Sequence, residues 1–228
     1  MIAALLCRNP SFLSINPIVG DINGNTKKII LIIKKIKSDI VVFSELSITG
    51  YSPQDLLLKR DFVEENIDAL KKIVQNTKNK TAIVGFIDKK DGFLHNSAAI
   101  IKNQQIVKMH HKICLPNYTI FDEKRWFKEG TEATIFELDG KKIGLSICED
   151  IWLPETIKMQ KEKGVELIIN ISASPYRKGK IEAIENVLIQ RWNENKIPMI
   201  VVNQVGAQDG IVYYGHSMYF KDGKIIKK

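Results

Sequence analysis

The chain alternates between short apolar runs and longer amphipathic segments. Apolar runs that predict buried strands occupy residues 39–43, 82–87, 143–147, 166–171 and 199–205. Continuous runs of this length are typical of strands covered on both faces. Segments with apolar residues at helical spacing lie between or beside them, at residues 25–37, 62–75, 153–163 and 180–195. Each of these helices is expected to bury one face against a sheet.

Hairpins interrupt the alternation of strands and helices. Two pairs of predicted strands are joined by short turns: 96–101 with 105–109 across 102–104, and 135–138 with 142–147 across Asp139-Gly140. An Asp-Gly pair is a strong hairpin signal. Hairpins mixed with strand–helix units predict an α/β sandwich rather than a purely parallel sheet. Because no linker, repeat or low-complexity stretch divides the sequence, we expect one domain over residues 1–228.

Composition narrows the class of protein. With 228 residues, of which 44% are hydrophobic, the chain can bury a substantial core. Its cysteines are Cys7, Cys114 and Cys148, an odd number without CxxC spacing. This argues against a disulfide scaffold or a metal site and predicts a reducing, cytoplasmic location. No apolar run is long enough to span a bilayer, so we expect no membrane partner.

The net charge of +8 raises the question of a nucleic-acid or anionic-membrane partner. Only five of the 34 cationic residues are arginines, which are preferred for bidentate contacts to phosphate and guanine. The lysines are dispersed along the chain. We therefore interpret the charge as a solvated lysine surface and expect no nucleic-acid partner.

One cysteine occupies a setting that favours chemistry. The segment Ile143-Gly-Leu-Ser-Ile-Cys-Glu-Asp-Ile-Trp152 is an apolar strand that ends at Cys148, and Pro154 follows at a position suited to the first turn of a helix. At such a junction a thiol is accessible to substrate, and the nearby helix N-terminus is expected to favour the thiolate. The alternative is a small buried hydrophobic residue, which is the commoner role of a free cysteine.

Two further segments have the same layout. Asp39-Ile-Val-Val-Phe-Ser-Glu-Leu46 is a strand followed by the carboxylate of Glu45, and residues 106–118 form a strand followed by Lys112 beside a proline turn. A carboxylate base, an ammonium and a thiol can together attack a carbonyl or nitrile carbon. Taken singly, Glu45 could instead be a capping or loop acid, and Lys112 a surface lysine.

These motifs resemble the carbon–nitrogen hydrolase (nitrilase) superfamily, and within it the glutaminase domains of glutamine-dependent NAD synthetases. The similar segments are residues 15–22, 43–57, 115–118, 121–125, 148–152, 171–176 and 202–206. The resemblance implies a nitrilase-like α-β-β-α sandwich in which Cys148 is the nucleophile, Glu45 the general base and Lys112 the cation.

The same resemblance implies residues that contact substrate. It places Tyr118, Ser174 and Lys180 against glutamine, and Glu123 as a second acid that helps to position the site. Simpler alternatives are a half-buried aromatic at Tyr118 and a capping role for Ser174. Cys114, two residues after Lys112, matches no nucleophile position.

The sequence also departs from the family pattern. Ser44 stands where a proline usually precedes the catalytic glutamate, which is expected to loosen the backbone there. Ser14 replaces a usual glutamine, and residues 1–11 do not resemble the family's start. The family's hydrolase domain continues beyond residue 228, so we expect the sandwich to be incomplete at its C-terminal end. No segment matches the ligase domain that binds ATP and deamido-NAD in NAD synthetases, and we expect no cofactor in this chain.

Three functions remain open from the sequence. The first is a glutamine amidohydrolase that supplies ammonia for NAD biosynthesis, in partnership with a ligase domain or subunit and as a homo-oligomer. The second is a free-standing amidase acting on another small amide. The third is a catalytically idle binding or assembly module.

Overall fold

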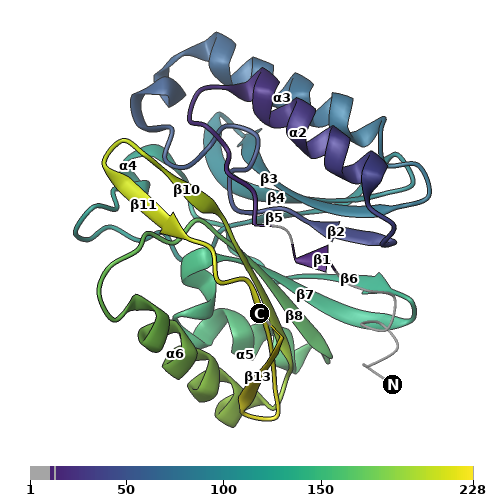
Figure 1. Cartoon of the computed structure of the whole chain (residues 1–228), viewed down its shortest axis with the longest axis vertical. Coiled ribbons are helices and arrows are strands. Elements are labelled where there is room, and N and C mark those ends of the chain that lie inside the picture. The colour runs from purple at the N-terminus through teal and green to yellow at the C-terminus, as the bar shows by residue number, and fades with distance from the viewer. Residues whose placement is uncertain (1–10, 13, 228) are drawn as a thin grey trace.

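The fold is seen in a computed structural model, which describes residues 11–12 and 14–227. Two sheets pack face to face, and each carries two long helices on its outer face (Figure 1). This is the predicted α-β-β-α sandwich. The predictions for residues 1–10 lie outside the described residues.

The first sheet has the strand order β1-β2-β3-β4-β5. Its strands are β1 (Ser11–Phe12), β2 (Ile40–Val42), β3 (Thr81–Lys90), β4 (Phe93–Lys102) and β5 (Gln105–His111). Helices α2 (Ile22–Lys35) and α3 (Arg60–Val74) cover it, and a short helix η1 (Gln54–Leu58) precedes α3. Side chains on β3 alternate between the two faces: Val84 and Phe86 pack under these helices, whereas Ile83 faces the other sheet.

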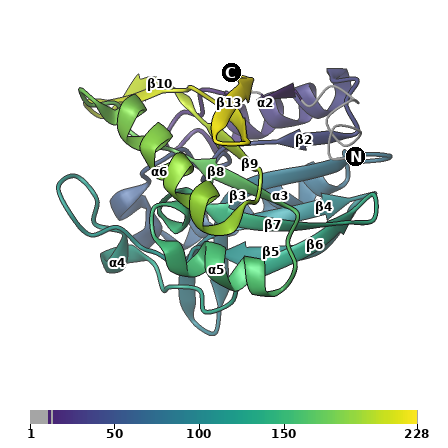
Figure 2. The ribbon, with the colours of Figure 1, turned by 90° about the horizontal axis from the view of Figure 1, so that it is seen from below.

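The second sheet has the order β13-β12-β9-β8-β7-β6. Its strands are β6 (Thr134–Leu138), β7 (Lys141–Ile147), β8 (Leu167–Ser172), β9 (Met199–Asn203), β12 (Met218–Lys221) and β13 (Lys224–Lys227). Helices α5 (Pro154–Glu162) and α6 (Lys180–Asn195) lie side by side across its outer face (Figure 2). The hairpin β10 (Val205–Gln208) and β11 (Ile211–Tyr214) stands apart as a two-stranded sheet, and the short helix α4 (Glu123–Trp126) lies in the loop after β5.

The turns follow their sequence signals. Leu138 pairs with Lys141 across Asp139-Gly140, and both turn residues have positive φ, as a type I′ hairpin requires. The sequence missed the first hairpin of the other sheet: β3 runs to Lys90 and β4 begins at Phe93, beyond the apolar core of either strand. It also missed β10 and β11, whose residues alternate weakly between buried and exposed.

Strand direction brings the sequence motifs together. β2 and β3 are parallel, and β7, β8 and β9 form a second parallel set. Because β4 is antiparallel to both β3 and β5, strand β5 runs in the same direction as β3. The segments that carry Glu45 and Lys112 follow β2 and β5 and therefore leave the first sheet at the same edge, and the segment that carries Cys148 leaves the second sheet after β7.

Close packing of β3 against the loop after β2 predicts an effect of Gly85. A Cβ atom at this position would overlap the backbone of Ser44 and Leu46, on either side of Glu45. We expect Gly85→Ala to lower the free energy of unfolding by about 3 kcal/mol, because backbone cannot move aside as a side chain can. Urea denaturation of the variant would measure this.

Gly92→Ala is the matched control. Gly92 lies in the turn between β3 and β4, where an added Cβ atom would meet nothing within 4 Å, and only its positive φ opposes a side chain. That conformation costs about 1–2 kcal/mol for an alanine. Equal losses in the two variants would contradict the close approach at Gly85.

Candidate active site

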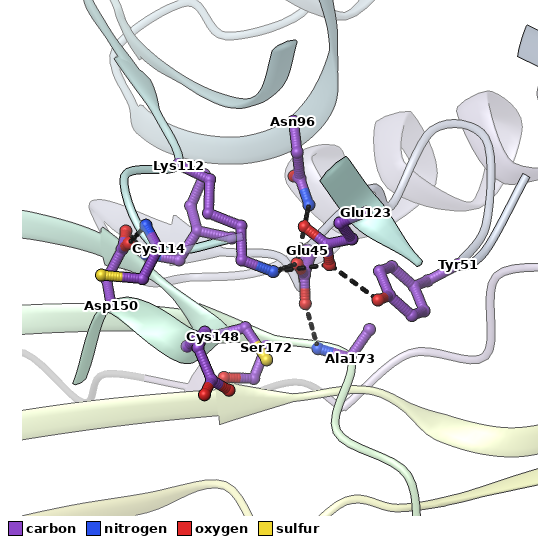
Figure 3. A network of polar contacts seen from close by, with 12 residues as sticks. Glu45, Tyr51, Asn96, Lys112, Cys114, Glu123, Cys148, Asp150, Ser172 and Ala173 are labelled. Carbon is purple, nitrogen blue, oxygen red and sulfur yellow. Dashed lines mark hydrogen bonds and ion pairs between the residues drawn. The ribbon is translucent and has the colours of Figure 1, made fainter. Parts of the chain in front are cut away.

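Three predicted residues meet at the ends of the two sheets. Glu45 follows β2, Lys112 comes directly after β5, and Cys148 comes directly after β7. Their exposed fractions are 0%, 1% and 5%, respectively, so all three are withdrawn from bulk water. Figure 3 shows Lys112 reaching toward Glu45, with Cys148 beside them.

Lys112 lies between two carboxylates. Its Nζ donates to Glu45 Oε1 at 2.8 Å and to Glu123 Oε1 at 2.7 Å. Burial by itself lowers the pKa of Lys112, but the carboxylates of Glu123 and Glu45 outweigh it and hold the pKa well above its usual value. The alternative of a solvated surface lysine is therefore wrong, and the ammonium is a permanent charge in the site.

Glu45 is held from both sheets. Its Oε1 also accepts a hydrogen bond from Asn96 Nδ2 on β4 at 2.8 Å, and its Oε2 accepts one from the backbone N–H of Ala173, after β8, at 2.8 Å. These donors orient the carboxylate although Ser44 replaces the usual proline. A solvent-exposed capping or loop acid would not be enclosed in this way.

Glu123 and Tyr51 complete the polar network. Glu123 Oε1 accepts from Tyr51 Oη at 2.7 Å, and its Oε2 lies 3.5 Å from Asn96 Nδ2. Burial raises the pKa of Glu123 above its usual value, while the Lys112 ammonium opposes this shift. Glu123 thus contacts Lys112 directly, in the place where the sequence predicted a second acid that helps to position the site.

Cys148 begins the short helix η2 (Cys148–Ile151), and its φ of 46° lies in the left-handed region that non-glycine residues seldom adopt. Its Sγ lies 3.7 Å from Ser174 Oγ. Burial, followed by the nearby Glu45 carboxylate, raises the pKa of the Cys148 thiol. The expectation that the nearby helix N-terminus favours the thiolate is therefore wrong, because burial and the Glu45 carboxylate favour the protonated thiol. A base must remove its proton as it reacts.

A cavity of about 630 Å³ is lined by residues from the loop after β5, from the segments after η2 and β8, and from the turn between β10 and β11. The residues that line it include Tyr118, Phe121, Trp152, Tyr176, Arg177 and Lys180. The hydroxyl of Tyr118 donates to both carboxylate oxygens of Glu149 at 3.0 Å, and Glu149 directly follows the nucleophile candidate. Lys180 Nζ lies 3.8 Å from the centroid of the Trp152 ring. The cavity lining thus combines aromatic surface with two cations, and one lining residue, Tyr118, contacts the Glu149 carboxylate.

The other thiols have different surroundings. Cys114 is partly buried and its Sγ contacts Thr156 Oγ1 at 3.8 Å. Burial and the Asp150 carboxylate raise the pKa of Cys114 to about 11. Cys7 lies outside the described residues. Within the part of the chain that the structure describes, no three His, Cys, Asp or Glu side chains are grouped to hold a metal ion, and no helix is long and apolar enough to cross a membrane.

Several site residues had no clear sequence signal. Asn96 and Tyr51 reach the cluster from β4 and from the loop after Glu45, and neither lies in an apolar run that ends at a reactive group. Glu149 could have been found, because it follows Cys148 directly. Tyr214, on the hairpin that the sequence missed, lies near Ser174 and Cys148, and burial raises the pKa of its hydroxyl.

Comparison with known proteins identifies the family of the chain. The profile of the carbon-nitrogen hydrolase family matches residues 13–228. Proteins named glutamine-dependent NAD(+) synthetase are 41% identical over 90% of the chain in Thermotoga maritima and 38% identical over 96% in Aquifex aeolicus. The chain spans only 36% and 40% of the lengths of these relatives.

Solved structures agree with the fold. The glutamine-dependent NAD+ synthetase of Acinetobacter baumannii, solved with ADP, superposes with a TM-score of 0.87 at 33% identity, over 94% of this chain and 41% of that one. An amidase of the nitrilase superfamily from Nesterenkonia shares the fold alone, with a TM-score of 0.82 at 18% identity, over 94% of this chain and 83% of that one. Because the family profile matches nearly the whole length of the chain and the fold is a nitrilase-like sandwich, the chain belongs to the carbon-nitrogen hydrolase family.

Proposed function

We propose that this domain hydrolyses the side-chain amide of glutamine through a thioester on Cys148. The observation that carries the proposal is the buried Glu45–Lys112–Glu123 network beside a desolvated thiol. It supplies a base, a cation and a nucleophile in one water-poor space, the combination that acyl transfer from an amide needs.

The chemistry follows from the protonation states. The Cys148 thiol keeps its proton at rest, so Glu45 accepts that proton as sulfur attacks the amide carbon. The ammonium of Lys112 faces the negative charge that develops on the amide oxygen. Glu45 returns the proton to the leaving nitrogen, and ammonia departs to leave a γ-glutamyl thioester. Water then attacks the thioester as Glu45 accepts one of its protons, and Glu45 passes this proton to the departing sulfur, so that glutamate is released and both the thiol and the carboxylate are restored.

The charged groups in and beside the cavity lining support an amino-acid substrate over a neutral amide. Lys180, in the lining, offers a cation to an α-carboxylate, and Glu149, which contacts the lining residue Tyr118, offers a carboxylate to an α-ammonium group. Tyr118 orients Glu149, and Ser174 lies beside the thiol. The names of the relatives support glutamine as well, whereas a free-standing amidase or an idle module would have no need of this pair of charges.

The ammonia would serve a synthetase. The relatives that the chain matches are more than twice its length and are named as NAD(+) synthetases. We therefore infer that a ligase domain or subunit uses the ammonia released here, with ATP and deamido-NAD as its own substrates. The homo-oligomeric state and cytoplasmic location stay predictions.

The nucleophile can be tested by covalent labelling. A diazo ketone analogue of glutamine should label Cys148 and leave Cys114 unmodified, because only Cys148 lies beside the base. Peptide mapping by mass spectrometry would locate the label. Cys148→Ala should abolish both labelling and release of ammonia. Label found mainly on Cys114 would contradict the assignment.

The base and the cation can be tested by near-isosteric variants. Glu45→Gln removes the proton acceptor, and Lys112→Met removes the charge while keeping most of the stem. Each should lower kcat by about 10²-fold or more, the usual effect of such groups. Steady-state ammonia release would measure this. Lys141→Met is the control, since Lys141 pairs with Glu166 away from the site. Near-native turnover in either site variant would make that residue structural.

Recognition of the amino-acid backbone can be separated from chemistry. Glu149→Gln should raise KM for glutamine by about 10- to 100-fold, because a hydrogen bond to a charged group contributes about 1.5–3 kcal/mol. KM for propionamide, which lacks the α-ammonium, should change little. Glu155→Gln, at an exposed position on α5, is the control. Equal effects on both substrates would argue against an amino-acid subsite and favour the neutral-amide alternative.

A further inference from the structure

One buried carboxylate joins the segments that carry Lys112 and Cys148. Asp150, fully buried, lies two residues after Cys148 in η2. Its Oδ1 accepts hydrogen bonds from the backbone N–H groups of Ile113 at 3.0 Å and Cys114 at 2.8 Å. These are the first two residues after Lys112. The contact to Cys114 is drawn in Figure 3.

The other oxygen of Asp150 faces its own sheet. Its Oδ2 accepts from the backbone N–H of Ile147 at 2.8 Å, immediately before Cys148. It also lies 2.9 Å from Nε2 of His110, two residues before Lys112. Asp150 therefore contacts residues before and after Lys112, on the segment that leaves β5 of the first sheet. It also contacts the residue before Cys148, at the end of β7 in the second sheet.

His110 holds the carboxylate in turn. The ring is fully buried, and its Nδ1 lies 3.2 Å from Thr134 Oγ1 at the start of β6. The hydroxyl of Thr134 donates to the backbone carbonyl of Met109 at 3.2 Å. The imidazole thus spans from β5 to the second sheet and meets Asp150 with one nitrogen and Thr134 with the other.

We propose that Asp150, held by His110, is a positioning residue that sets Lys112 against Cys148 across the two sheets. The proposal rests on the function proposed above only in assigning Lys112 and Cys148 their roles. The physical reason is that these residues lie on segments with no hydrogen-bonded strand pairing between them, since β5 and β7 belong to different sheets. A carboxylate with four convergent donors is a rigid link, because removing any donor leaves buried charge unsatisfied.

Variants of both partners test the link. Asp150→Asn keeps the size but replaces one acceptor oxygen by an N–H donor, which faces backbone N–H groups. His110→Leu removes the donor to Asp150, whereas His110→Gln retains an N–H donor on a side chain of similar reach. Asn66→Ala is the stability control: Asn66 is fully buried and bonds the backbone of Ile87, away from the site.

The readout is the rate at which iodoacetamide alkylates Cys148 in the folded protein. Mass spectrometry measures the extent of alkylation over time. It needs no knowledge of the natural substrate. We expect at least a 10-fold slower rate in Asp150→Asn and in His110→Leu, with recovery to within about 3-fold of wild type in His110→Gln. Asn66→Ala should lower the melting temperature without changing the rate. Where glutamine is hydrolysed, kcat should fall with the alkylation rate while KM changes by less than about 3-fold.

The outcomes separate the two proposals. If iodoacetamide alkylates Cys148 of the wild-type protein no faster than Cys114, the assignment of Cys148 as the nucleophile fails, whatever the role of Asp150. If Cys148 reacts fast and Asp150→Asn reacts equally fast, the positioning role is overturned. Should Asp150→Asn not fold, the comparison of His110→Leu with His110→Gln decides, because equal rates in these two would also overturn it.

Discussion

The site depends on the ammonium of Lys112 between two buried carboxylates. Without this cation, Glu45 and Glu123 would be like charges enclosed in the same dry space, and one of them would take up a proton. With it, each carboxylate has a cation as its partner, which the role proposed for Glu45 requires. Removing one member of a buried ion pair leaves an uncompensated charge, so the three side chains act as one unit in both stability and chemistry.

The sandwich provides what that unit needs. Glu45, Lys112 and Asn96 come from the first sheet, and Cys148 and the N–H of Ala173 come from the second. Apolar residues fill the layer between the sheets and hold their separation. Because close-packed interiors move little, donors from one sheet can fix an acceptor in the other. The candidate site therefore lies between the two sheets, and neither sheet by itself contains all of its residues.

Desolvation acts differently on the Cys148 thiol and on the Lys112 ammonium. It raises the pKa of the Cys148 thiol and so suppresses a resting thiolate. It also strengthens the interaction of Lys112 with negative charge that appears during the reaction. In the proposed mechanism the thiol is therefore activated by Glu45, which accepts its proton as sulfur attacks an electrophilic carbon.

The sequence by itself determined most strands, the long helices and the three candidate groups that follow strands, because apolar runs and helical spacing are local properties of the chain, as at residues 39–43, 143–147 and 180–195. It could not determine what encloses those groups. Asn96, Tyr51 and the His110–Asp150 link come together only when two sheets pack, and no spacing along the chain records that contact. The protonation of Cys148 was mispredicted for the same reason: a helix start is visible in the sequence, but burial and a facing carboxylate are decided by the tertiary structure.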